Sequence, residues 1–272
     1  MKTLNTFGAA GAALAIVGVL AFSEQAVAES LGTIQADISF TDPGRTRNID
    51  TSIGPNGYAG LAYGSETDPT WNFQLDPDGA FRAWCLEPSE YLDGNNNVYQ
   101  VNTLEHAPEA GRFGAMGGRD GLSGITGATR ADDMRLLFGG GFDFRSGTFK
   151  NNVRGLTGRD LYTAFQVAVW EIANEDTGAS YNVTADGFKR TSGGAETEAE
   201  WAGVAAQANH WLDSLGNHTP DNTLLALVDD GNQDFVVSAV PIPAAAWLFG
   251  SAMVGAVVLG RRKSKKPAQA EV

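Results

Sequence analysis

The chain has 272 residues, a formal net charge of -13 at pH 7 and a single cysteine. Such an acidic surface repels nucleic acid, which argues against a nucleic-acid partner. One cysteine cannot form a disulfide within the chain, so a fold held together by disulfides is excluded.

The first residues have the three parts of an export signal. Lys2 supplies a positive charge, residues 7–22 form an uncharged and mostly apolar run, and residues 26–28 read Ala-Val-Ala. This order is typical of a secretory signal peptide that signal peptidase cuts after Ala28. A buried N-terminal helix is the alternative, but the run is rich in glycine and lacks helix caps. We therefore expect residues 1–28 to be a signal peptide.

The middle of the chain, residues 29–239, is more acidic than the whole. It carries 13 Lys and Arg residues against 30 Asp and Glu residues, a balance of -17. A stretch of this length suits one domain. We expect an α+β fold here: a single mixed domain with antiparallel strands and one central, buried helix.

The hydrophobic pattern of this region predicts strands and helices in mixed order. The helix over 159–174 is apolar almost all round, which predicts its central position. Gly139 to Gly141 are expected to stop the helix before them. Asp229 to Asn232 are expected to form the turn between the last two strands. The predicted strands cover 31–40, 57–63, 80–87, 97–104, 223–228 and 233–240, and the predicted helices cover 132–138, 159–174 and 195–215.

The lone cysteine, Cys85, lies in a strand-like and largely apolar segment. An odd cysteine in an exported protein indicates either a bond between molecules or a special thiol. The simpler interpretation is an inert, buried cysteine that packs as a small hydrophobic side chain. Cys85 alone favours this simpler interpretation.

A second unusual residue, Gln166, lies on the predicted central helix. It is the only polar residue between Ala164 and Trp170. A buried carboxamide without hydrogen-bond partners costs a few kcal/mol. The simpler interpretation is a core glutamine that bonds to the backbone of a neighbouring strand.

One reaction would account for both residues. The Cys85 thiol can attack the Gln166 carboxamide carbon and expel ammonia, which leaves an internal thioester. Holding the two groups in fixed contact supplies much of the acceleration, because effective molarities are large. The product is a stored electrophile that Trp84, Phe165 and Trp170 would shield from water until an amine reaches it.

The two segments resemble those of bacterial thioester domains of the TQXA type, which occur in surface adhesins of Gram-positive bacteria. The family has Tyr-Cys-x-Glu and Thr-Gln-x-Ala-x-Trp, and this chain has Trp-Cys-Leu-Glu at 84–87 and Phe-Gln-Val-Ala-Val-Trp at 165–170. A Leu-Leu-Phe-Gly element at 136–139 lies between them, as the family pattern expects, and the resemblance spans residues 80–174. It implies a Cys85–Gln166 thioester, with Phe165 in place of the family's threonine. The supporting residues that it implies are Trp84, Glu87, Phe165, Ala168 and Trp170.

The end of the chain has the features of a membrane-retention signal. Residues 244–260 carry no charge, and five basic residues follow them between 261 and 266. About 17 apolar residues are near the lower limit for a transmembrane helix. The basic cluster is expected to stay in the cytoplasm, with the preceding domain outside. A core helix of a soluble domain is the alternative, which the adjacent cationic cluster disfavours.

This tail resembles a PEP-CTERM sorting signal, closest to its VPLPA-CTERM variant, over residues 240–266, with 267–272 as the cytoplasmic end. The resemblance implies a Gram-negative bacterium and an exosortase that cleaves the tail. It further implies an intermediate anchored in the inner membrane, followed by a place at the cell surface or in an exopolysaccharide or biofilm matrix. The sorting residues that it implies are Val240, Pro241, Ile242, Pro243, Ala244, Arg261 and Arg262.

No metal-binding or catalytic pattern stands out in the sequence. The three histidines show no metal-ligand spacing, and the Asp- and Asn-rich turns at 76–79 and 93–97 lack a calcium-binding loop. A cysteine hydrolase that pairs Cys85 with His106 or His210 stays open, although no peptidase signature surrounds the cysteine. We therefore expect no metal, no cofactor and no turnover enzyme.

Besides the weaker hydrolase interpretation, two functions are expected for the exported domain. The first is a covalently reacting adhesin whose thioester captures an amine-bearing ligand on a surface or in the matrix. The second is a non-reactive structural protein of the exopolysaccharide or biofilm matrix, in which Cys85 is inert.

Overall fold

The computed structural model describes residues 31–40, 46–49, 51–52, 57–66, 80–90, 92, 97–107, 121–125, 127–175, 180–185, 187–191, 197–229 and 231–239. The predicted signal peptide and the predicted sorting tail lie outside these residues. Within the described ranges, no helix is both long and apolar enough to cross a membrane.

The described strands of the main sheet are all antiparallel, and most of the sheet is closed. Strand β1 pairs with β5 on one side and with β3 on the other, so six strands form a barrel and β2 extends it beyond β3. The strands are β1 (Gly32–Ser39), β2 (Thr46–Ile49), β3 (Gly57–Glu66), β4 (Ala80–Cys85), β5 (Asn97–Thr103), β8 (Leu224–Val228) and β9 (Phe235–Ser238).

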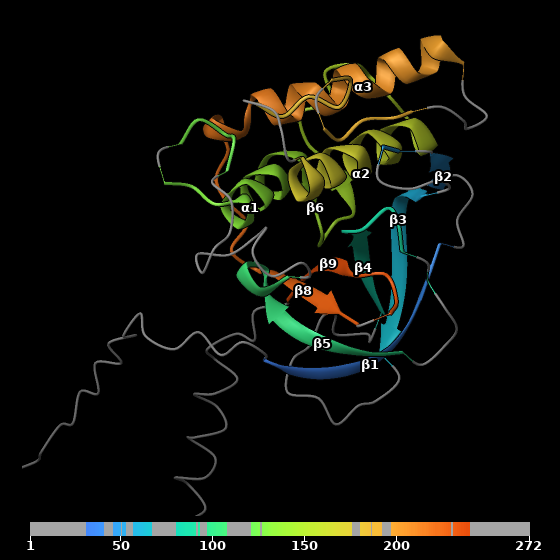
Figure 1. The fold of residues 1–272 in the computed structure, drawn as a ribbon, viewed down its shortest axis with the longest axis vertical. Coiled ribbons are helices and arrows are strands. Elements are labelled where there is room, and N and C mark those ends of the chain that lie inside the picture. The colour runs from blue at the N-terminus through green and yellow to red at the C-terminus, as the bar shows by residue number, and fades with distance from the viewer. Residues whose placement is uncertain are drawn as a thin grey trace, which may run out of the picture.

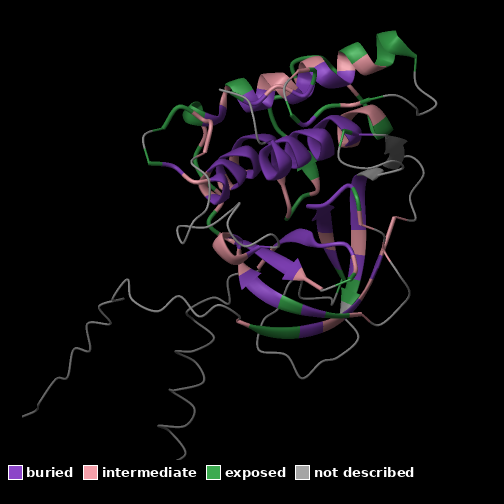
Figure 2. Ribbon diagram, in the orientation of Figure 1, coloured by how far each residue is buried: buried purple, intermediate pink, exposed green. Residues whose placement is uncertain are grey.

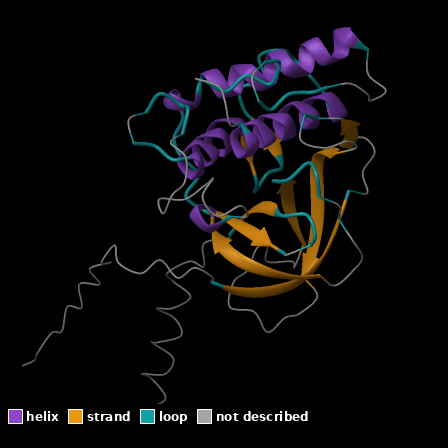
Figure 3. Ribbon diagram, in the orientation of Figure 1, coloured by secondary structure: helices purple, strands orange, loops and turns teal. Residues whose placement is uncertain are grey.

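The helices gather at one end of this barrel (Figures 1 and 3). Helix α2 lies between α3 and the strands, and it contacts β2, β3 and β4 as well as both other long helices. The helical elements are α1 (Arg130–Gly141), α2 (Gly158–Asn174) and α3 (Glu198–Asp213), with short 3-10 turns η1 (Leu104–His106) and η2 (Leu215–Asn217). A small hairpin of β6 (Phe142–Asp143) and β7 (Thr148–Phe149) follows α1.

The mixed α+β content and the antiparallel strands agree with the expectation from sequence. All six predicted strands are present, with ends that differ from the predicted ones by up to three residues. The predicted turn after residue 228 joins β8 to β9 as an antiparallel hairpin. The closure of the sheet, strand β2 and the β6–β7 hairpin were not predicted.

Two of the long helices begin at capping boxes. The side chain of Thr129 accepts a hydrogen bond from the backbone N–H of Asp132, whose carboxylate bonds back to the Thr129 N–H. Thr197 and Glu200 form the same arrangement before α3. These reciprocal bonds satisfy backbone donors that a helix start leaves free, which fixes where each helix begins. The described α3 is therefore shorter than predicted, running from Glu198 to Asp213.

The first helix ends within the expected run of glycines, but at Gly141 and not before Gly139, so the three glycines form its last residues. They also permit close packing. A Cβ atom at Gly141 would lie 2.5 Å from the ring of Phe165, and Cβ atoms at Gly139 and Gly140 would overlap Thr219 and His218. The absence of side chains therefore lets α1 approach its neighbours, which outweighs the weak helix propensity of glycine.

Helix α2 is buried along most of its length, as predicted. Every residue from Thr163 to Asn174 is buried, so Figure 2 shows α2 in the buried colour except over its first residues, which are exposed or partly buried. Phe165 lies at the centre of an aromatic cluster that joins α2 to the other layers. Its ring neighbours are Trp84, Phe138, Phe142, Phe149 and Trp211, with centroid distances of 4.7 to 5.7 Å.

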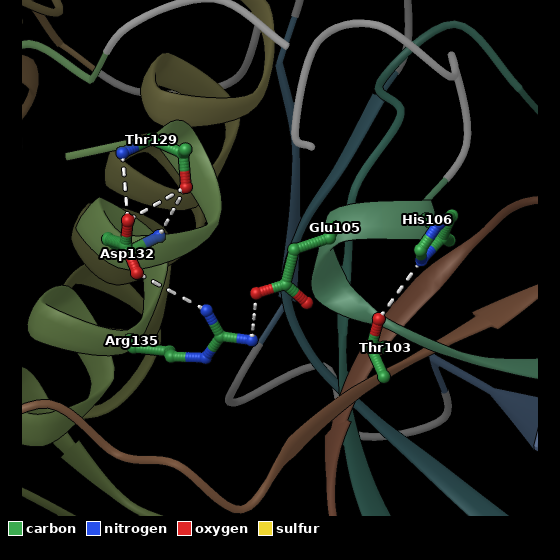
Figure 4. Close-up of polar contacts among 6 residues, drawn as sticks. All are labelled: Thr103, Glu105, His106, Thr129, Asp132 and Arg135. Carbon is green, nitrogen blue, oxygen red and sulfur yellow. Dashed lines mark hydrogen bonds and ion pairs between the residues drawn. The ribbon is translucent and has the colours of Figure 1, made fainter. Parts of the chain in front are cut away.

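A polar contact also links the helices to the barrel, near the surface (Figure 4). Arg135 of α1 forms an ion pair with Glu105 of η1, with Nη2 and Oε1 2.6 Å apart. The same guanidinium lies 3.4 Å from the Asp132 carboxylate. Both partners of the first pair keep some exposure, at 15% for Arg135 and 29% for Glu105.

Candidate functional site

Cys85 is the last residue of β4 and is completely buried. It lies opposite Phe235 of β9, and the next residue, Leu86, donates one more backbone hydrogen bond to the carbonyl of Asp234, at 2.8 Å. The predicted strand ran on to Glu87, whereas β4 ends two residues earlier. The cysteine thus lies where the strand gives way to a turn, inside the protein.

Gln166 lies on α2 and is also completely buried. Its Oε1 accepts a hydrogen bond from the Cys85 backbone N–H at 3.1 Å, and its Nε2 donates to the Cys85 carbonyl at 2.7 Å. The carboxamide therefore lies flat against the cysteine backbone. This geometry satisfies the polar group, as the simpler interpretation expected, and it also brings the two residues of the predicted thioester together.

The sulfur of Cys85 has its own polar partners. The indole N–H of Trp170 donates to Sγ at 3.4 Å, and the side-chain amide of Gln233 donates at 2.6 Å. The thiol itself donates to the carbonyl of Glu87 at 3.2 Å. Two N–H groups aimed at one sulfur are an arrangement that stabilises negative charge developing there.

The same surroundings keep the resting thiol protonated. Burial raises the pKa of Cys85 far above its usual range, and the hydrogen bond from Trp170 only partly opposes this. The cysteine is therefore not a preformed thiolate at neutral pH. Any reaction at Sγ has to move the thiol proton as the new bond forms.

Aromatic side chains enclose the pair. Trp84 and Phe165, which precede the two residues in sequence, are fully buried and contact each other with ring centroids 4.7 Å apart. Trp170 lies one turn after Gln166 and contacts Phe188. Ala168 is buried and contributes to the packing of the core. The site is thus closed to water on the sides that these residues cover.

Two polar residues near the pair were missed in the sequence. Gln233 lies just before β9, and its amide also donates to the carbonyls of Glu87 and Glu90. Asn174, at the end of α2, donates to the carbonyl of Leu86 at 3.3 Å. Both hold the turn after β4 in place. Neither belongs to a local motif, and only the barrel topology brings residue 233 beside residue 85.

Glu87 contributes both its backbone carbonyl and its side-chain carboxylate to the surroundings of Cys85. Its carbonyl accepts from the thiol, while its carboxylate lies in a cluster with Glu90 and Asp234. Burial raises the pKa of Glu87 well above its usual range, and the neighbouring Asp234 charge adds to this. Burial likewise raises the pKa of Asp234. Acidic side chains are thus concentrated beside the cysteine.

Comparisons with family models, with curated proteins and with solved structures gave no match.

The remaining predicted residues have simple positions. The sorting residues at 240–244 and at 261–262 lie outside the described residues. Among the described residues, the polar partners of the Cys85 sulfur include no histidine. His106 contacts Thr103 instead, and His210 lies on α3, where its carbonyl accepts from Ser214. The described part of the chain thus offers no support for a Cys–His hydrolase.

Proposed function

We propose that Cys85 and Gln166 form an internal thioester, and that the protein uses it once to attach itself to an amine on a cell surface or in the surrounding matrix. The observation that supports this most is that the Gln166 carboxamide is hydrogen-bonded to the backbone of a cysteine whose sulfur receives two N–H donors, from Trp170 and Gln233. The acceptor group is thus held against the residue that carries the nucleophile.

The reaction balances without any other reactant. A bond forms between Sγ of Cys85 and the side-chain carbonyl carbon of Gln166, and the bond from that carbon to Nε2 breaks. The thiol proton leaves with the nitrogen as ammonia. The Cys85 N–H that bonds to Oε1 polarises the carbonyl and supports the negative charge that develops on this oxygen. The closed site limits hydrolysis of the product.

Capture of a ligand reverses this chemistry with a different amine. The amine attacks the thioester carbon, an amide bond forms to the side chain of residue 166, and the sulfur leaves and regains a proton. The donors from Trp170 and Gln233 stabilise the sulfur as it departs. The reaction consumes the site, so the protein acts as a single-use electrophile and not as a turnover enzyme.

The predicted ends place this chemistry outside the cell. In the proposal, signal peptidase removes residues 1–28, the C-terminal helix holds an intermediate in the inner membrane, and an exosortase releases the α+β domain to the surface. The test is terminal sequencing of surface material. Mature protein should begin near Glu29 and end near Pro241, and the recovery of both ends intact would contradict the sorting proposal.

Mass spectrometry of the intact, purified chain tests the thioester. The wild type should be lighter than its sequence by one ammonia and should lack a titratable thiol when folded. Methylamine should add to Gln166 and release the Cys85 thiol. Cys85→Ala and Gln166→Ala should each remove the adduct, and Gln166→Glu should keep the shape while offering a poor acceptor.

Two further variants make the test specific. Gln233→Ala removes the other carboxamide beside the sulfur. The mass of this variant should still be lower than its sequence mass by one ammonia. Gln207→Ala removes a buried glutamine on α3 that bonds to backbone groups in the same way as Gln166. It should keep the adduct, which separates loss of chemistry from loss of stability. Peptide mapping should identify residues 85 and 166 as the two cross-linked positions.

The second candidate is a non-reactive structural protein of the matrix. One observation favours it: the Gln166 carboxamide already has partners on both its oxygen and its nitrogen, as a core glutamine requires. A full sequence mass, a free thiol and no amine adduct would establish this candidate in place of the first.

A further inference from the structure

Three carboxylates meet at the turn that covers Cys85. Glu87 and Glu90 belong to this turn after β4, and Asp234 lies immediately before β9. A carboxylate oxygen from each lies within 4.8 Å of the others. Glu87 and Asp234 are buried, and Glu90 is half-buried.

One oxygen of this cluster, Oε2 of Glu87, has no N–H or hydroxyl donor among the described residues, on a residue that is only 9% exposed. The Glu87 carboxyl faces those of Glu90 and Asp234. Asp234 accepts a hydrogen bond through Oδ1 from the backbone N–H of Asp229. Among the described residues, no arginine or lysine forms an ion pair with any of the three. Buried carboxylates without a cation are unfavourable, because like charges repel and water is excluded.

We propose that Glu87, Glu90 and Asp234 bind a divalent cation, and that the cation is calcium. All three donors are carboxylate oxygens, which hard cations prefer and which Zn²⁺ and Cu²⁺ do not favour. Calcium binds oxygen at about 2.3–2.6 Å, so two ligands on opposite sides of one ion lie about 5 Å apart. Magnesium needs a tighter octahedron, with opposite ligands about 4 Å apart. The three oxygens lie within 4.8 Å of one another, so one ion of either kind can contact all of them. Calcium is the better choice because it accepts irregular sets of carboxylate oxygens, whereas magnesium demands a near-ideal octahedron.

The cation would link the turn after β4 to the start of β9. The same turn supplies the Glu87 carbonyl that accepts from the Cys85 thiol and from Gln233. Bound calcium would therefore stabilise the turn after β4, which packs against the Cys85 sulfur. Neither Cys85 nor Gln166 is a ligand, so the site does not depend on the proposed thioester, and Cys85→Ala should bind calcium as the wild type does.

Direct binding and thermal unfolding test the site. The full chain, purified in detergent and stripped with EDTA, should take up one calcium ion in equilibrium dialysis at millimolar calcium. Its Tm should rise by about 5 °C over the EDTA sample, as expected for a ligand well above its Kd. Magnesium at the same concentration should give a smaller rise. No uptake, or equal Tm values in calcium and EDTA, would overturn the proposal, since protons alone would then neutralise the cluster.

Variants give a signature that general damage to the fold cannot mimic. Glu90→Gln, at the least buried ligand, should abolish the calcium-dependent rise in Tm. In EDTA its Tm should equal or exceed that of the wild type, because one repulsive charge is gone. Asp234→Asn should lose the calcium response as well. The matched control is Asp213→Asn at the exposed end of α3, which should keep the full response. A response retained in both cluster variants would also overturn the proposal.

Discussion

Two buried glutamines in different parts of the molecule bond to the backbone in the same way. Gln166 of α2 accepts from the Cys85 N–H and donates to its carbonyl. Gln207 of α3 accepts from the Arg154 N–H at 3.0 Å and donates to the Asn151 carbonyl at 3.0 Å. Both residues are fully buried. The hydrogen-bond geometry of a core glutamine therefore does not by itself indicate a reactive site.

The difference lies in what accompanies each carboxamide. Gln207 faces a loop whose residues 151 and 154 are asparagine and arginine, whereas Gln166 faces a cysteine whose sulfur receives two N–H donors. Of these two glutamines, only Gln166 lies against a thiol whose sulfur has N–H donors. Changes at one glutamine but not the other can therefore separate packing from chemistry.

The largest expected effect comes from removing the two glutamines in turn. Gln207→Ala leaves backbone groups unsatisfied and should lower the free energy of unfolding by about 2 kcal/mol. Gln166→Ala should cost more, because it removes the cross-link between residues 85 and 166, worth about 4 kcal/mol by the loop-entropy argument used for disulfides. Denaturant unfolding of both variants measures the difference. Equal losses would mean that no cross-link exists in the folded protein.

Phe165→Ala should break the packing around Gln166 and leave that around Gln207 largely intact. The ring contacts five aromatic side chains, so its loss should cost about 3 kcal/mol or slightly more. Phe165→Leu is the control, since it keeps most of the volume and should cost less. Chemical denaturation measures both. A loss below about 1 kcal/mol for the alanine variant would contradict the central place of this ring.

Trp170→Phe sharpens the comparison at the sulfur. It keeps an aromatic ring in the core but removes the indole N–H that donates to Sγ. We expect a loss of stability of about 1 kcal/mol. Methylamine should also open the thioester more slowly, because the departing sulfur has lost a donor. Unfolding and adduct formation followed over time measure the two effects, and unchanged kinetics would remove Trp170 from the reaction.

The smallest effect is expected at the surface contact between α1 and η1. Partial burial acts to raise the pKa of Glu105, but Arg135 outweighs it, so the pKa of this carboxyl is lowered. Its contribution to stability is therefore present above pH 4.5, the ordinary value, and is lost as the pH falls below it. Glu105→Gln should cost about 0.5 kcal/mol at neutral pH and nothing in acid. Unfolding at both pH values checks this, and an equal loss at the two would contradict the ion-pair account.

Much of the fold could be predicted from local sequence. Alternating apolar residues located the strands, and the apolar run over 159–174 located the central helix, because burial dictates residue type along an element. The same approach failed where the outcome depends on distant partners. The helix was expected to end before Gly139. It continues to Gly141 because these glycines, which lack side chains, pack closely against Phe165 and residues 218–219.

The candidate site, like the fold, could be predicted where local sequence motifs mark it and not where distant segments meet. The two short motifs point to Cys85 and Gln166, and the structure places these residues against each other. Gln233 and Asp234 could not be found, since barrel closure brings β9 beside β4 across about half of the chain. The thioester itself stays a prediction.

The exact mass of the purified, folded chain tests the central claim most directly. A thioester between Cys85 and Gln166 removes one ammonia and the free thiol together, so the protein should be one ammonia lighter than its sequence, or than its processed sequence if the ends are cut. Denaturation in methylamine should raise the mass by one methylamine and restore the thiol. A full sequence mass with a titratable Cys85 thiol would contradict the account.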